Sequence, residues 1–231
     1  MLRLSIAVPF LGLLFLSHSA QAQPPRSVDW SKLPDPATQQ FEDPYRDLSR
    51  SQFESLMSLA QLQIILSGEK DESERADLET HAREISKDLQ AQGLDPQWIL
   101  AQRDVVAERR QRAATSTNPN VDGEFVEIAG YLLVAKDAED GVTVAFLLPG
   151  RGVCMHLPPP VPNQLIRLDI DEFPEPLAPC ISASVRGRLL ADENDATVPI
   201  FEDTAFLWSS WRLEVAEAST AGALSPDDNK Q

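Results

Sequence analysis

The sequence predicts an α+β protein in which a helical segment precedes a small, five-stranded antiparallel β-barrel of the OB type. Two observations lead to this prediction. Apolar residues recur every three or four positions in residues 51–114 and every second position in much of residues 121–216. These are the periods of an amphipathic helix and of a half-buried strand. Five short strands over about a hundred residues favour a closed barrel, with a small sandwich as the alternative.

Three helices are expected in the helical segment. The first begins at Ser51 and ends at Gly68, and the second spans residues 72–92. The third has Asp95 as its N-cap and Pro96 as its first helical residue, and it ends in a run of arginines that suits a helix C-terminus. The apolar positions of the first helix are Phe53, Leu56, Met57, Ala60 and Ile64.

Five strands are expected after the polar loop at residues 115–120. Gly130 and Gly187 lie inside two of them and would relieve crowding where a tightly coiled barrel bends. Arg167 and Asp169 alternate with apolar residues and are expected to face outward. The expected strands lie at Val126–Val134, Val142–Leu148, Ile166–Ile170, Ile181–Leu189 and Trp211–Val215.

The N-terminal residues 1–22 have the pattern of a secretory signal peptide. Arg3 precedes a short apolar run, and Ala20–Ala22 is an A-x-A cleavage site. The run is too short for a spanning helix, so we expect cleavage after Ala22 and a soluble periplasmic protein. A proline-rich leader at residues 23–50 and a disordered acidic tail at residues 217–231 are expected to flank the folded part.

The charge of the chain disfavours two classes of partner. Cleavage of the signal removes only one charged residue, Arg3, which leaves 19 basic against 36 acidic side chains and a net charge of −17. Such a chain repels phosphate backbones and anionic membrane surfaces. We therefore expect no nucleic-acid partner, and no membrane span once the signal is removed.

The loop between the second and third expected strands carries a candidate metal site. Cys154 and His156 are two residues apart, so on an extended backbone both side chains project to the same side. Their Cα atoms would lie roughly 6.5 Å apart, from which sulfur and imidazole can converge on one ion. A thiolate and an imidazole suit zinc or copper. The sequence thus predicts a metal site at Cys154 and His156.

Other states of Cys154 stay open. A disulfide with Cys180, the chain's other cysteine, would close a loop of about 25 residues and stabilise the fold by roughly 3 kcal/mol. Disulfides are usual in an oxidising compartment. A nucleophilic pair with His156 is another reading, although neighbours at i and i+2 rarely bring sulfur and base into hydrogen-bonding register. The last possibility is that Cys154 is an unreactive buried cysteine.

The residues after His156 are expected to order this loop. Prolines fix φ and donate no backbone hydrogen bond, so the segment suits an edge rather than an interior strand. Side-chain amides can then bond the loop in place. The expected loop-ordering residues are Pro158, Pro159, Pro160, Asn163 and Gln164.

Four segments carry a resemblance to a known family. They read VEIAGYLL (residues 126–133), FLL (146–148), CMHLPPPVPNQ (154–164) and VRGRL (185–189). In this order they resemble the motifs of a bacterial exported family of unknown function, domain-of-unknown-function family 3299, over residues 121–216. The chain departs from these motifs at Val161, which interrupts the proline run, and at Ala129, where proline is common.

The resemblance implies a small periplasmic protein without an established activity, of a kind sometimes found beside transporter components with a suspected link to metal supply. Cys154, His156, Asn163 and Gln164 fall on the characteristic loop of the family, whereas Cys180 lies outside its pattern. The resemblance therefore raises metal or ligand binding to the same level as the disulfide.

These observations predict a non-enzymatic periplasmic binding or accessory protein, which binds a transition metal through the Cys/His loop or serves an envelope transport system. The expected partner is an envelope protein or a transporter component. The alternative is a structural protein–protein interaction module in which the loop is a rigid scaffold. A Cys/His-dependent enzyme ranks third, and no residue is assigned a catalytic or cofactor-binding role.

Overall fold

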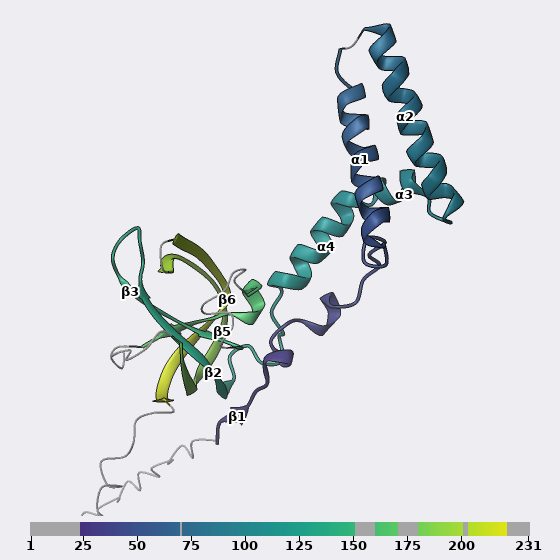
Figure 1. The fold of residues 1–231 in the computed structure, drawn as a ribbon. Coiled ribbons are helices and arrows are strands. Elements are labelled where there is room, and N and C mark those ends of the chain that lie inside the picture. The colour runs from purple at the N-terminus through teal and green to yellow at the C-terminus, as the bar shows by residue number, and fades with distance from the viewer. Residues whose placement is uncertain (1–23, 70, 151–159, 171–179, 201–202, 221–231) are drawn as a thin grey trace, which may run out of the picture.

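The computed structural model describes residues 24–69, 71–150, 160–170, 180–200 and 203–220. Within these ranges the chain is an α+β protein with four α-helices and a mixed sheet of six strands (Figure 1). The helices are α1 (Arg50–Leu66), α2 (Glu72–Ala91), α3 (Pro96–Ala101) and α4 (Arg103–Thr115). The strands are β1 (Arg26–Ser27), β2 (Phe125–Lys136), β3 (Thr143–Leu148), β4 (Ile166–Asp169), β5 (Ile181–Ile200) and β6 (Asp203–Thr220). Short 3-10 turns are η1 (Trp30–Lys32), η2 (Pro36–Thr38) and η4 (Pro162–Gln164).

The expected helices are confirmed, and their first turns show why they begin where they do. Ser49 and Gln52 form a reciprocal capping box at α1, which satisfies two backbone N–H groups that no helical carbonyl can reach. Asp71 caps α2, and Asp95 accepts a hydrogen bond from the Trp98 N–H at 3.1 Å. The third expected helix is divided in two, because a turn at Gln102 separates α3 from α4.

The strands form a closed ring of hydrogen-bonded pairs in the order β2-β3-β4-β6-β5, because β5 also pairs with β2. The expectation of a purely antiparallel sheet is wrong: β4 pairs with β6 in parallel, and β1 adds a sixth strand parallel to β2. The reason is geometric. Strand direction cannot alternate all the way around a ring of five, so one pair must run parallel.

Two glycines allow the ring to close tightly. A Cβ at Gly187 would lie 2.1 Å from the carbonyl oxygen of Glu214, and one at Gly130 would lie 2.5 Å from that of Leu148. Both distances are too short for any side chain, so neighbouring backbones approach here as only glycine permits. The register of β5 against β6 also shifts at Arg186/Gly187.

The ring has an inner core. Trp211, Leu213, Ile166 and Leu147 are fully buried within it. These residues alternate along their strands with residues that point out of the ring, as the period of two predicts.

A second apolar cluster lies on the outer side of the ring. The strands β5 and β6 continue well past the residues expected for them and form a long hairpin. Its distal part contributes Val198 and Leu207 to a cluster with Phe146 and Leu148 of β3. Because both its faces are covered, β3 is buried at every position from Val144 to Leu148.

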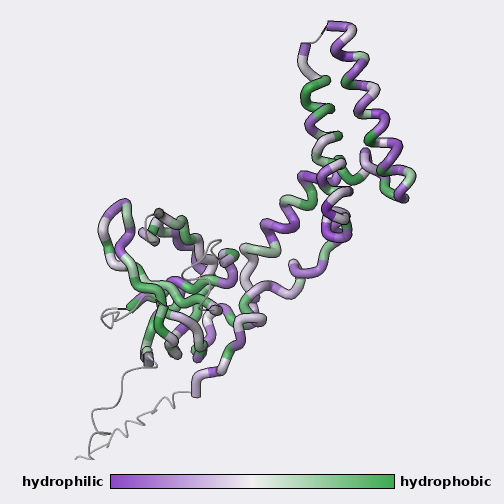
Figure 2. The backbone as a smooth tube through the Cα atoms, viewed as in Figure 1, coloured by the Kyte–Doolittle hydropathy of each residue, from purple (hydrophilic) through white to green (hydrophobic). Residues whose placement is uncertain are grey.

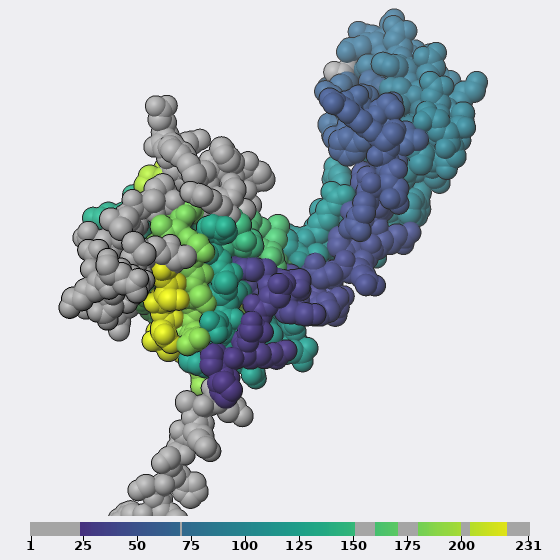
Figure 3. Space-filling model, turned by 60° about the horizontal axis from the view of Figure 1, so that its bottom comes forward, coloured from purple at the N-terminus to yellow at the C-terminus, as the bar shows by residue number. Residues whose placement is uncertain are grey.

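The helices form an arm that extends from the ring (Figures 1 and 3). Leu56, Leu59, Leu89 and Ile99 make its small core. The side of α1 that is buried differs from the one emphasised by the sequence pattern, since Phe53, Met57 and Ile64 are exposed. None of the described helices is long and apolar enough to cross a membrane.

The leader is packed along the molecule over its described part. The indole N–H of Trp30 donates to the carbonyl of Ala129 at 2.7 Å, and the hydroxyl of Tyr45 donates to the carbonyl of Ile99 at 2.8 Å. Leu33 is fully buried in the ring core. At the other end, β6 continues through Thr220, beyond the expected start of the tail. The expected signal peptide and the rest of the tail lie outside the described residues.

Candidate binding pocket

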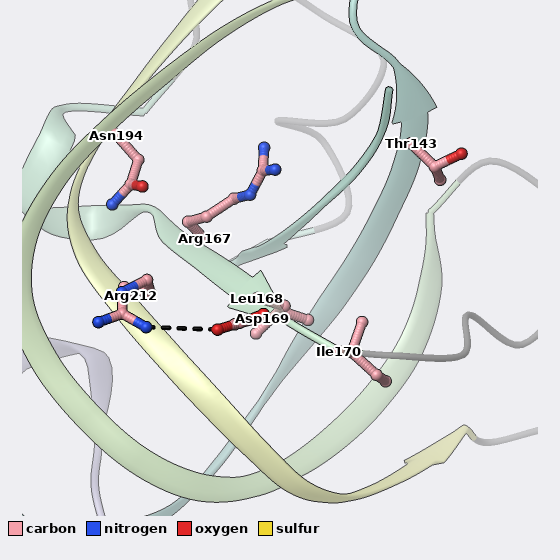
Figure 4. Close-up of a pocket in the computed structure, with 7 residues that line it drawn as sticks. All are labelled: Thr143, Arg167, Leu168, Asp169, Ile170, Asn194 and Arg212. Atoms are coloured by element: carbon pink, nitrogen blue, oxygen red, sulfur yellow. Dashed lines mark hydrogen bonds and ion pairs between the residues drawn. The ribbon is translucent and has the colours of Figure 1, made fainter. Parts of the chain in front are cut away.

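A polar pocket of about 250 Å³ opens on the outer side of the ring, where the long hairpin leaves it (Figure 4). Residues of β3, β4, β5 and β6 meet here, because β4 lies between β3 and β6 in the sheet and β5 pairs with β6. The residues that line the pocket are Thr143, Arg167, Leu168, Asp169, Ile170, Asn194 and Arg212.

Arg167 is the central side chain of this pocket. Its register partners are Phe146 on β3 and Arg212 on β6, so all three share the outer face of the sheet. The guanidinium lies 5.2 Å from the centre of the Phe146 ring, a cation–π distance. Figure 4 shows it directed away from the Arg212–Asp169 pair.

The surroundings of Arg167 are unusual because this acidic chain gives it no carboxylate partner among the described residues. Its side chain is half-buried and forms no ion pair with another described residue. Burial lowers the pKa of Arg167, and the charges of Asp137, Asp169 and Asp140 oppose this only in part. The guanidinium has therefore lost part of its hydration without gaining a carboxylate partner.

Arg212, the register partner of Arg167 on β6, differs from it because it is paired with carboxylates. Its guanidinium contacts Asp192 at 2.7 Å and both Asp169 and Glu214 at 3.3 Å. The hydrogen bond to Asp192 is the main cause that raises the pKa of Arg212. Arg212 is thus neutralised by the protein itself, whereas Arg167 keeps a planar fork of donors to offer to an anion. Such a fork matches the geometry of a carboxylate.

The whole of the expected metal site lies outside the described residues, together with part of the proline run. Cys154, His156, Pro158 and Pro159 lie outside the described residues. Within the described ranges, no three His, Cys, Asp or Glu side chains come together as a metal-binding group. Another histidine of the chain, His81, is exposed on α2. The metal site at Cys154 and His156 therefore stays a prediction.

The end of the proline loop is tied to two other parts of the chain. Pro160 is half-buried, and η4 follows it. The side-chain amide of Asn163, which is buried, donates to the carbonyls of Ala113 and Ser116 at 2.8 and 3.0 Å. These carbonyls lie at the C-terminus of α4, where no helical N–H can reach them. Gln164 donates to the carbonyl of Trp30 at 2.9 Å.

Cys180 lies in the outer apolar cluster, immediately before β5. It is 4 % exposed and has a φ of 61°, a left-handed conformation that costs most side chains about 1 kcal/mol or more. Its sulfur is disulfide-bonded. The only other cysteine of the chain is Cys154.

Arg167 was not among the residues that the sequence singled out as functional. The alternation of β4 predicted its outward direction, which the pocket confirms. Its partial burial depends on the hairpin of β5 and β6, which folds back over the sheet. The residues around Arg167 in the sequence do not predict that contact. A lone arginine in a strand between Ile166 and Leu168 is the single clue that the sequence offers.

Comparison with known proteins gives a family and one distant structure. The model of a family described as "Protein of unknown function (DUF3299)" matches residues 47–214. The crystal structure of a DUF3299 family protein from Pseudomonas aeruginosa PAO1 at 2.45 Å resolution is similar, with a TM-score of 0.36 and 18 % identity. The match covers 53 % of this chain and 80 % of that one. No curated protein matches the chain.

Proposed function

The chain belongs to the DUF3299 family, and we propose that it is a non-enzymatic binding or accessory protein of the cell envelope. In this proposal the strand ring is an OB-like barrel, and the pocket over Arg167 receives a carboxylate group of its ligand. The single observation that carries the proposal is the half-buried guanidinium of Arg167, which has no ion pair among the described residues.

The order of the strands supports the OB-like assignment. The ring β2-β3-β4-β6-β5, with β4 parallel to β6, has five members and connects them in a partly crossed order. OB folds bind their ligands on the face of their second and third strands. By this analogy the binding face is that of β3 and β4, which carry Phe146 and Arg167.

The chemistry of the pocket favours a carboxylate over a nucleic acid. Arg167 offers two parallel N–H groups, and the Thr143 hydroxyl and the Asn194 amide are additional donors on the pocket wall. A polyanion would meet Asp169 of the pocket wall and the net negative charge of the chain, both of which repel phosphate backbones. A single carboxylate needs only the guanidinium of Arg167, which is directed away from Asp169 (Figure 4).

Titration with succinate tests this function by isothermal calorimetry. We expect binding to the wild type and a loss of about tenfold or more in Arg167→Gln, which is the usual effect of removing a charged hydrogen-bond donor. Arg188→Gln is the matched control, because Arg188 is an exposed arginine of the same ring. Arg167→Lys keeps the charge but loses the fork and should bind weakly. Equal binding by all four proteins, or none by the wild type, refutes the pocket.

The runner-up function is an interaction module in which the proline loop is a rigid scaffold. The hydrogen bonds of Asn163 and Gln164 to α4 and to Trp30 favour it, since they hold the end of the loop against the arm and the leader. A protein whose loop is scaffolding should bind its envelope partner equally well after Arg167→Gln, and lose it after Asn163→Ala. The two functions thus predict opposite rankings of these two variants.

The metal site remains a separate proposal, in competition with a disulfide. The disulfide state of Cys180 supports pairing with Cys154, and a paired Cys154 could give no thiolate to zinc or copper. Thiol titration of unreduced, denatured protein separates the two. No free thiol supports the pairing. Two free thiols, with stoichiometric metal that is lost in Cys154→Ser and in His156→Ala, support the metal site.

The envelope location rests on the N-terminal sequence. Fractionation of expressing cells should place the mature protein in the periplasm, and mass spectrometry should find Gln23 as its first residue. An intact N-terminus in the cytoplasmic fraction contradicts the location, and with it the part of the proposal that concerns envelope transport.

A further inference from the structure

One side of α1 carries an apolar stripe that nothing in the described part of the chain covers. Phe53, Met57 and Ile64 are 44, 49 and 66 % exposed. They follow one another at intervals of four and seven residues with Ala60 between them, so they share one face of the helix. We call Phe53, Met57, Ala60 and Ile64 the α1 stripe. The adjoining side of α1 provides the buried leucines of the arm.

The α1 stripe itself carries no charged side chain. The only charged residues of α1 are Arg50 and Glu54, which pair with each other at 2.9 Å. The neighbouring α2 carries six acidic and three basic side chains. Figure 2 shows the same contrast, with apolar colour along α1 and a mostly hydrophilic α2. Exposure of so much apolar surface beside so little charge is the mark of an interaction site.

A groove of about 480 Å³ adjoins the stripe between α1 and α3. Ala60 and Ile64 belong to both, so the stripe forms one wall of the groove. A hydrogen bond of 3.2 Å between the amides of Gln63 and Gln97 joins the two helices there. The remaining lining residues are Ser67, Leu100, Ala101 and Arg103.

We infer that the α1 stripe binds the α1 stripe of a second copy of this chain, with the two helices antiparallel and crossing at Ala60. Two copies of a chain with a net charge of −16 repel each other over most of their surface. An uncharged apolar stripe is complementary to itself. The electrostatic repulsion between two copies is smallest where such stripes meet. A two-fold contact requires such a self-complementary patch.

The spacing of the stripe fits this symmetry. Met57 and Ile64 lie three and four residues on either side of Ala60, or about 5 Å along the helix axis in each direction. In an antiparallel pair Met57 of one copy therefore faces Ile64 of the other. The small side chain of Ala60 lets the helices come close, and a flexible methionine suits the groove beside Ile64.

A lipid surface fits the stripe less well. Helices that lie on membranes flank their apolar face with lysine and arginine, which anionic headgroups attract. Near the stripe lie Arg50, already paired with Glu54, and Arg103 of the groove, already paired with Asp104. The acidic α2 lies alongside.

Sedimentation of the mature chain over a wide range of concentration tests the inference. We expect a species of twice the monomer mass. Ile64→Asp should weaken association about a hundredfold or more, because the symmetric contact then buries two unpaired carboxylates. Val142→Asp is the matched control, since Val142 is 54 % exposed on the turn before β3 and adds the same charge far from the arm. Circular dichroism should show unchanged helix content in each variant.

Ala60→Trp separates the proposed crossing from general stickiness. A tryptophan at the crossing adds apolar area but keeps the helices apart, so it should abolish the dimer, whereas non-specific association would become stronger. A monomer at every concentration overturns the inference, even if another envelope protein binds the stripe. A dimer that survives both Ile64→Asp and Ala60→Trp overturns it as well. Neither result bears on the Arg167 pocket, which lies on the ring.

Discussion

The ring and the arm bury their apolar residues in different ways. The ring is packed on both sides of β3, with the inner core around Trp211 and the outer cluster beneath the hairpin. The arm has a single thin core of four buried residues and leaves the adjoining side of α1, with Phe53, Met57 and Ile64, exposed. The ring covers its apolar residues with its own strands. The arm leaves apolar residues of α1 exposed, and these are available to a partner.

The two regions also differ in how far apart in sequence their contacts lie. The arm consists of helices that follow one another closely along the chain. The ring joins β2 to β5 and β4 to β6, which are separated by tens of residues. Such a ring forms as one cooperative unit, while an arm of local contacts can open by itself.

Gly187→Ala should have the largest effect on stability, because it disrupts the close pairing of β5 with β6 that closes the ring. The new methyl group would lie 2.1 Å from the backbone carbonyl of Glu214, which cannot move aside as a side chain can. We expect a loss of about 3 kcal/mol in the free energy of unfolding, at the upper end of overpacking costs. Urea titration measures it. Gly68→Ala is the control, since its methyl group would meet only the Ile65 carbonyl at 3.5 Å.

Leu59→Ala should lower the free energy of opening the arm by a similar amount, and the free energy of unfolding the whole chain by less. Leu59 is 1 % exposed in the arm core, and such truncations cost about 2–5 kcal/mol where they apply. If the arm opens independently, hydrogen exchange will quicken in α1, α2 and α3 and stay unchanged in β2 and β5. Equal acceleration in ring and arm would show that the two unfold together.

Asn163→Ala acts on the joint between the two regions. It removes one of two donors to each of the carbonyls of Ala113 and Ser116, which keep their hydrogen bonds from Gln39 and Asp35. Loss of such hydrogen bonds typically costs about 0.5–1.5 kcal/mol each. We expect faster exchange at the end of α4 and little change inside the ring. Asn163→Asp should be worse, because it replaces the donor with a negative charge at a helix C-terminus.

The smallest effect is a loss of arm stability at alkaline pH. Burial raises the pKa of Tyr45 above its ordinary value of 10.0, and its hydroxyl donates to the Ile99 carbonyl. A raised folded-state pKa gives stability that is complete below the unfolded-state pKa and is lost as the pH rises through the folded-state value. Helix content monitored between neutral and strongly alkaline pH should therefore fall less in Tyr45→Phe. An identical alkaline profile in both proteins contradicts this assignment.

Much of the local structure could be predicted from the sequence, because it depends on neighbours within a few positions. Asp95 and Pro96 start α3 as expected, since an N-cap acts on the N–H groups of the next turn. Alternation predicted the strand positions and the outward direction of Arg167. The signal peptide, the metal site and the proline loop before Pro160 stay predictions, because they lie outside the described residues.

What the sequence by itself determined is therefore the kind and order of the elements, the caps that begin the helices and the glycines that let strands approach. Only the tertiary structure decided that β4 and β6 run parallel, that the hairpin half-buries Arg167, and that Phe53, Met57 and Ile64 face outward while their neighbours are buried. The physical reason is distance along the chain. An amphipathic period shows that a face is apolar, but which element covers that face depends on segments tens of residues away, and α1 has more apolar surface than α2 and α3 can cover.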